Sequence, residues 1–128
     1  EPSVPSSGTI VLAEDNRTIR QMFAAALRQK GFSVVEASDG LEFMDHMAAL
    51  ATVGTSLLAV VLDIDMPGHS GLECLRLLRE RGDTTPAVLI SGGPIHAVTD
   101  PRVLPLPKPF NSADLLKAIA QVVHERKS

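Results

Sequence analysis

The chain has 128 residues, 45% of them hydrophobic, which is enough for one packed core and the size of one compact domain. Its 12 Lys and Arg against 15 Asp and Glu give a net charge of −3, and only 3% of the residues are aromatic. Direct nucleic-acid binding is therefore not expected, because it usually needs basic patches and stacking aromatics. The single cysteine excludes an internal disulfide and no apolar run can cross a bilayer, so we expect a cytoplasmic chain that does not enter the membrane.

Residues 1–8 are rich in Pro and Ser and predict a flexible linker or lead-in. The remainder, 9–127, is predicted to be one domain in which short apolar runs alternate with helical patterns. Strands are predicted over 9–13, 32–37, 57–62, 87–90 and 103–106. Helices are expected from a cap at Asp15 or Asn16 to Gly31, after the turn 38–40, over about 72–80 and over about 112–125.

Helical spacing predicts which apolar side chains of each helix face the core. The expected stripes are, in chain order, Ile19, Met22, Phe23, Ala26 and Leu27; Leu41, Met44, Met47 and Ala48; Leu72, Leu75 and Leu78; and Leu115, Leu116, Ile119, Val122 and Val123. Cys74 lies within the third helical pattern, and we interpret it as a semi-buried filler of the core.

Alternating strands and helices predict a doubly wound α/β fold, in which helices cover both faces of a parallel sheet. The most apolar run, 57–62, is the candidate for the central strand. Pro105 and Pro107 predict that the last strand is irregular or at an edge, because proline cannot donate to a central ladder. Glycines and prolines crowd the segment after Ser91, so a fourth helix there is expected to be short, displaced or absent.

Polar residues follow the predicted strands at the edge where parallel sheets form their sites. Glu14 and Asp15 follow the first strand, Asp63 ends the third, and Ser91 and Lys108 follow the fourth and fifth. Carboxylates that meet at one edge repel each other, and a cation such as Mg²⁺ offsets that charge. Asp63, at the tip of a buried strand, can act as a nucleophile and form an aspartyl phosphate, with the lysine facing a phosphoryl oxygen.

Each of these residues also has a simpler interpretation when it is taken alone. An Asp at a junction between strand and helix is commonly a cap or a turn former. Glu14 and Asp15 can be a solvated cap, Ser91 a loop residue and Lys108 a surface lysine. A site is favoured because all of them fall at strand ends of one predicted sheet.

Four segments resemble, in order, the signature blocks of response-regulator receiver domains of two-component signalling. They are VLAEDN at 11–16, LDIDMPGHSG at 62–71, LISG at 89–92 and LPKPF at 106–110. The resemblance covers nearly the whole chain after Gly8. It implies a flavodoxin-like, five-stranded parallel sheet with strand order 2-1-3-4-5.

The resemblance also implies a function and a role for each site residue. Asp63 would take a phosphoryl group from a phosphohistidine of a histidine kinase or histidine phosphotransfer domain, and the domain would then switch between two conformations rather than work as an enzyme. Ser91 would be the switch hydroxyl, and Lys108, after which the peptide bond is often cis in this family, would contact the phosphoryl oxygens. The ligands of Mg²⁺ would be Glu14 through water, Asp15, Asp63 and the backbone carbonyl of Asp65.

The sequence departs from the family pattern at two places. Receivers usually carry an aromatic residue three positions before the lysine, and here that position is Pro105, which cannot swing inward. The segment 92–107 is several residues shorter than the family generally has. Both departures lie between the switch hydroxyl and the lysine, and a stand-alone receiver and one joined to a larger sensor kinase both remain open.

Two other functions compete with a phosphorylated receiver. One is an interaction module with the receiver fold that is not phosphorylated, which the unusual segment 92–107 motivates. The other is a small phosphohydrolase, since Asp63-Ile64-Asp65 resembles the Asp-x-Asp motif of haloacid-dehalogenase-type phosphatases. That motif normally lies on the first strand of its domain, whereas here it follows the third.

Overall fold

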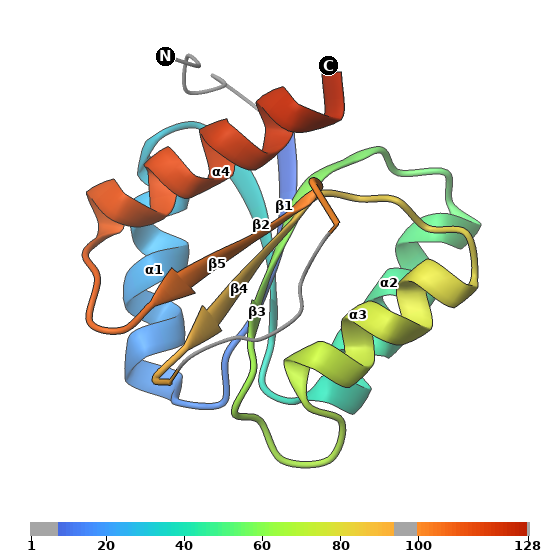
Figure 1. Ribbon diagram of the computed structural model, residues 1–128, viewed down its shortest axis with the longest axis horizontal. Coiled ribbons are helices and arrows are strands. Elements are labelled where there is room, and N and C mark those ends of the chain that lie inside the picture. Colours follow the sequence, from blue (N-terminus) through green and yellow to red (C-terminus); the bar gives the residue numbers. More distant parts are fainter. Residues whose placement is uncertain (1–7, 94–99, 128) are drawn as a thin grey trace.

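A computed structural model describes residues 8–93 and 100–127. These residues form five strands and four helices that alternate along most of the chain (Figure 1). The elements are β1 Gly8–Ala13, α1 Arg17–Gln29, β2 Phe32–Ala37, α2 Gly40–Thr52, β3 Leu57–Asp63, α3 Gly71–Glu80, β4 Ala87–Ser91, β5 Val103–Pro107 and α4 Ser112–Lys127. Of the predicted lead-in, 1–8, residues 1–7 lie outside the described part, and Gly8 belongs to β1, which begins one residue earlier than expected.

The strands form one parallel sheet in the order β2-β1-β3-β4-β5. Helices α1 and α4 cover one face, and α2 and α3 cover the other (Figure 1). The doubly wound architecture, the strand order and the central position of β3 are therefore confirmed. All five strands point the same way, so their carboxyl ends meet along one edge of the sheet.

Alternate residues of the central strands supply two separate apolar layers. Ile10 and Leu12 of β1 pack with α1 and α4, whereas Val11 and Ala13 pack with α2 and α3. All four side chains are fully buried. A strand that is buried on both faces must be apolar at every position, which explains the continuous apolar runs in the sequence.

Three helices begin at polar caps just beyond the carboxyl ends of β1, β2 and β3. The side chains of Asn16, Asp39 and Ser70 accept hydrogen bonds from backbone N–H groups of the first helical turn, at 3.0, 2.7 and 3.2 Å. Of the two expected caps of the first helix, Asn16 is the one used. Gly31 follows its end with a φ of 102°, a conformation that favours glycine.

The buried faces of two helices differ from the expected stripes. In α2, Leu41 is 61% exposed and Ala48 is exposed, while Phe43 is fully buried. In α3, Leu72 is 42% exposed, and Cys74 is fully buried rather than semi-buried. The expected stripes are thus only partly correct: Met47, Leu75 and Leu78 are buried as predicted, whereas the exposed members lie on outer faces that also carry apolar side chains.

Strand β5 lies at the edge of the sheet, as its prolines predicted. Its register with β4 pairs Leu89 with Pro105 and Ser91 with Pro107. Residues 92–93 and 100–102, the described ends of the β4–β5 connection, contain no helix. The prediction of a short, displaced or absent fourth helix otherwise falls on 94–99, which lie outside the described residues.

None of the helices in the described ranges combines the length and the apolar character that a membrane crossing requires.

Candidate functional site

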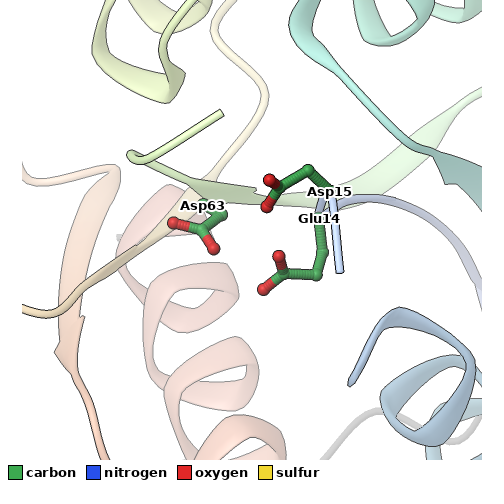
Figure 2. A group of neighbouring side chains, drawn as sticks. All are labelled: Glu14, Asp15 and Asp63. Carbon is green, nitrogen blue, oxygen red and sulfur yellow. The ribbon is translucent and has the colours of Figure 1, made fainter. Parts of the chain in front are cut away.

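Three carboxylates meet at the carboxyl edge of the sheet. Figure 2 shows Glu14 and Asp15, which follow β1, turned toward Asp63 at the end of β3. One carboxylate oxygen from each residue lies within 4.8 Å of those of the other two. Glu14 and Asp63 are 3% and 1% exposed, whereas Asp15 is exposed. The cluster is therefore buried on one side and open to solvent on the other.

Lys108 and the backbone of Asp65 hold the carboxylate of Asp63 on both of its oxygens. The Lys108 Nζ donates to Asp63 Oδ2 at 3.1 Å, and the Asp65 N–H donates to Asp63 Oδ1 at 2.9 Å. Lys108 follows β5, and the peptide bond between it and Pro109 is cis. Desolvation lowers the pKa of Lys108, but its hydrogen bond to Asp63 and the nearby carboxylate charges outweigh this, so the pKa is raised.

The carboxyl group of Glu14 is the one most affected by the crowding of negative charge. Burial raises its pKa to about 7, and the neighbouring Asp63 acts in the same direction. One of its oxygens accepts a hydrogen bond from the Asn16 N–H at 3.0 Å. Near neutral pH this group shares the site with two other acids, a charge arrangement that favours binding of a cation.

Ser91 ends β4 on the same edge, but its hydroxyl is turned to its own loop. The Oγ donates to the Gly93 carbonyl at 2.7 Å and accepts from the Gly93 N–H at 3.1 Å. The side chain is only 6% exposed. The edge of the sheet thus gathers Glu14, Asp15, Asp63 and Lys108, with Ser91 nearby in a separate hydrogen-bonded turn.

One residue that contacts this loop was missed by the sequence reasoning. Arg20 of α1 donates from Nη1 to the backbone carbonyl of Glu14 at 2.9 Å. Apolar periodicity does not select Arg20, because it is a charged residue within a helix. Its contact is with a backbone carbonyl, which leaves no pattern in the sequence.

An apolar hollow of about 260 Å³ opens beside the carboxylates. Phe23 and Phe110 stack at its wall with ring centroids 4.9 Å apart, and Met22 is 57% exposed there. The lining residues are Glu14, Ile19, Met22, Phe23, Lys108, Pro109 and Phe110. Met22 is therefore on the rim of this hollow rather than in the core, where the helical stripe had placed it.

Gly71 is required because the first turn of α3 approaches the backbone of Asp63. A Cβ at this position would lie 2.5 Å from the Asp63 carbonyl oxygen and 3.0 Å from its carbonyl carbon. Neither the strand nor the helix start can move away cheaply, since both are tied into regular structure. The glycine thus keeps α3 close to the strand that carries Asp63.

We expect Gly71→Ala to lower the free energy of unfolding by about 1–3 kcal/mol, because overpacking against backbone costs more than the gain in helix propensity. Urea unfolding measures this change. Gly92→Ala is the matched control, since a Cβ there meets nothing within 4 Å. Equal stability of the two variants would contradict the close approach.

The five-stranded parallel sheet carries an acidic cluster and a lysine at its carboxyl edge, an arrangement that is compatible with a phosphoacceptor site. The family model of the response regulator receiver domain matches residues 10–120. The chain therefore belongs to the response-regulator receiver family.

Relatives support this assignment over nearly the whole chain. The transcriptional regulatory protein TctD of Salmonella typhimurium is 39% identical over an alignment of 132 positions, which covers 91% of this chain and 55% of that protein. The chain thus spans about half the length of this curated relative. A response regulator receiver protein from Sinorhizobium medicae is 30% identical with a TM-score of 0.79, covering 94% and 97% of the two chains. The receiver domain of the hybrid histidine kinase CckA is 31% identical with a TM-score of 0.73, covering 91% and 99%.

Proposed function

We propose that Asp63 accepts a phosphoryl group from a phosphohistidine. An Asp63 oxygen would attack phosphorus while the bond from phosphorus to the imidazole nitrogen breaks, and the electron pair of that bond would stay on the imidazole. The observation that carries the proposal is that Asp63 is 1% exposed yet is held by Lys108 at 3.1 Å beside two further carboxylates. A carboxylate in such a fixed position is ready for nucleophilic attack.

The residues present fit a magnesium ion. Three carboxylate oxygens lie within 4.8 Å of one another, and the exposed side of the cluster leaves room for the water ligands that Mg²⁺ retains. We propose that Glu14, acting through water, Asp15 and Asp63 hold the ion together with the backbone carbonyl of Asp65. When bound, the ion would supply positive charge to the phosphoryl oxygens.

Lys108 and Ser91 complete the proposed machinery. Lys108 already faces Asp63, and its raised pKa keeps it charged for a phosphoryl oxygen. Ser91 would have to leave the Gly93 carbonyl to reach the phosphoryl group, so its hydroxyl can report phosphorylation to the β4–β5 connection. Pro105 stands where the family usually has an aromatic, so this signal would travel without that side chain.

The partner that we propose is a histidine kinase or a histidine phosphotransfer domain. The apolar hollow beside Glu14 and Lys108 supports a protein donor, because the exposed Met22 and the partly exposed Phe110 on its lining offer contact area for docking. The domain would work in the cytoplasm, alone or attached to a sensor kinase, and would act as a switch rather than as a turnover enzyme.

Intact mass measurement after incubation with acetyl phosphate and Mg²⁺ tests the proposal. We expect one phosphoryl adduct on the wild type that disappears with EDTA and in Asp63→Asn. Asp65→Asn is the matched control, because it removes a carboxylate two residues away and keeps the backbone donor to Asp63. This control is expected to retain the adduct.

The outcomes also separate the competing functions. A folded wild type that takes no adduct from acetyl phosphate or from a phosphorylated histidine donor would favour an interaction module. Repeated turnover of a phosphate monoester would favour a phosphohydrolase that uses Asp63 and Asp65. An adduct that persists in Asp63→Asn would place the acceptor elsewhere.

A further inference from the structure

The loop that carries Glu14 and Asp15 is fixed through its backbone at two points. The Glu14 N–H donates to the Ala37 carbonyl at the end of β2, at 3.0 Å. The Glu14 carbonyl accepts from Arg20 Nη1 at 2.9 Å. The first contact continues the ladder between β1 and β2, whereas the second comes from a side chain one turn into α1. The direction in which the chain leaves β1 therefore depends on Arg20.

Glu36 of β2 holds the guanidinium of Arg20 in place. Arg20 Nε donates to Glu36 Oε1 at 3.3 Å, and the Arg20 side chain is only 13% exposed. Arg28 contacts the other oxygen of the same carboxylate, from Nη1 to Oε2 at 3.1 Å. Arg28 is 49% exposed and uses Nη2 on the Val34 carbonyl, so its contacts lie with β2 and away from Glu14. The two arginines share one acid but only one of them is seen to contact the acidic loop.

A planar guanidinium suits this bridging role. It can donate from Nε to a carboxylate and from Nη1 to a carbonyl in fixed relative directions, while an ammonium group offers a single point of contact. Arg20, a residue of α1, thus links Glu36 of β2 to Glu14, the residue that follows β1.

We propose that Arg20, oriented by Glu36, is a positioning residue for the metal site and sets the placement of the Glu14 and Asp15 carboxylates. The inference rests on the proposed function, since it names what prepares that same site for its cation. Partners of metal ligands commonly change metal affinity by about 10–100-fold when they are removed, because the ligands lose their shared geometry.

The direction of the change in Mg²⁺ affinity distinguishes positioning from charge. Arg20 is a cation near an acidic cluster, so removal of its charge alone would strengthen the binding of Mg²⁺. Loss of positioning has the opposite effect and weakens it. A weaker site in a variant that lacks the arginine therefore cannot arise from simple electrostatics.

The test measures the dissociation constant of Mg²⁺ by titration calorimetry in wild type, Arg20→Met, Arg20→Lys and Arg28→Met. We expect Arg20→Met to raise the dissociation constant about tenfold. Arg20→Lys should also weaken binding although it keeps the charge, because a lysine cannot bridge Glu36 and the Glu14 carbonyl. Arg28→Met removes the same charge and one contact with Glu36, and we expect it to leave the affinity within about twofold of wild type.

Adduct formation from acetyl phosphate gives the second readout. In Arg20→Met the yield should fall at low Mg²⁺ and recover at saturating Mg²⁺, since Asp63 and Lys108 are untouched. Unchanged or tighter Mg²⁺ binding in Arg20→Met, or an equal loss in Arg28→Met, would overturn the positioning role while the proposed function stands. A wild type that binds no Mg²⁺ would overturn both.

Discussion

Glu14→Gln is expected to make the metal-free protein more stable at pH 8 and to remove most of its pH dependence between about pH 4.5 and 7. The pKa of Glu14 rises from 4.5 to about 7 on folding. Burial is the larger cause, and the neighbouring Asp63 adds to it. Across this window the folded state keeps a proton that the unfolded state has lost, so the stability of the wild type falls as pH rises. The loss amounts to roughly 3 kcal/mol and is complete above pH 7.

Urea unfolding in EDTA at pH 5 and pH 8 measures this effect. Asp15→Asn is the control, because Asp15 is exposed and lies next to Glu14. We expect the control to keep most of the pH dependence that Glu14→Gln removes. Addition of Mg²⁺ at pH 8 should restore stability to the wild type, since a ligand that binds only the folded state stabilises it. Wild-type stability that does not change between the two pH values would contradict the assignment to Glu14.

Phe43→Ala is expected to lower the free energy of unfolding by about 3–5 kcal/mol. Phe43 is fully buried between α2 and the sheet, in the apolar layer that also contains Val11, Leu62 and Leu78. Truncation of the ring removes buried apolar surface and leaves a cavity, because close-packed strands on the other side cannot move in to fill it.

Leu41→Ala is the matched control for this prediction. Leu41 lies on the same helix two residues earlier and is 61% exposed, so its truncation should change stability by less than about 0.5 kcal/mol. Chemical denaturation of both variants at one pH gives the comparison. A larger loss from Leu41→Ala than from Phe43→Ala would mean that α2 packs with the face predicted from the sequence.

The proximity of the site residues could be predicted from the sequence, because it depends only on the direction of the strands. Residues that follow parallel strands meet at one edge whatever the details of packing. Glu14, Asp63 and Lys108 were identified in this way, and the structure brings their side chains together. A separate argument, the missing N–H donors of its prolines, predicted that β5 is irregular or at an edge.

The full set of buried residues in α2 and α3 could not be predicted, because each helix has apolar residues on more than one face. In α2 Met47 of the expected stripe is buried, but Gly40 and Phe43 are the buried residues of the first turn in place of Leu41. At Gly40 the helix packs directly against the β3–α3 loop. A Cβ there would lie 2.1 Å from the His69 carbonyl oxygen, so only glycine fits. A close approach between two backbones leaves no apolar periodicity in the sequence.

The two prolines of β5 have a consequence for what can bind along the edge of this sheet. The Lys108 N–H points inward to Ser91, so by alternation the backbone nitrogens of residues 103, 105 and 107 face outward. Two of these are prolines without a hydrogen to donate, and the Val103 N–H already bonds to the Asp100 carbonyl. An additional strand would find no donor at these positions, so the β5 edge of the sheet is protected from growing by edge-to-edge association. A protein that binds along β5 would therefore have to contact its side chains rather than add a strand to the sheet.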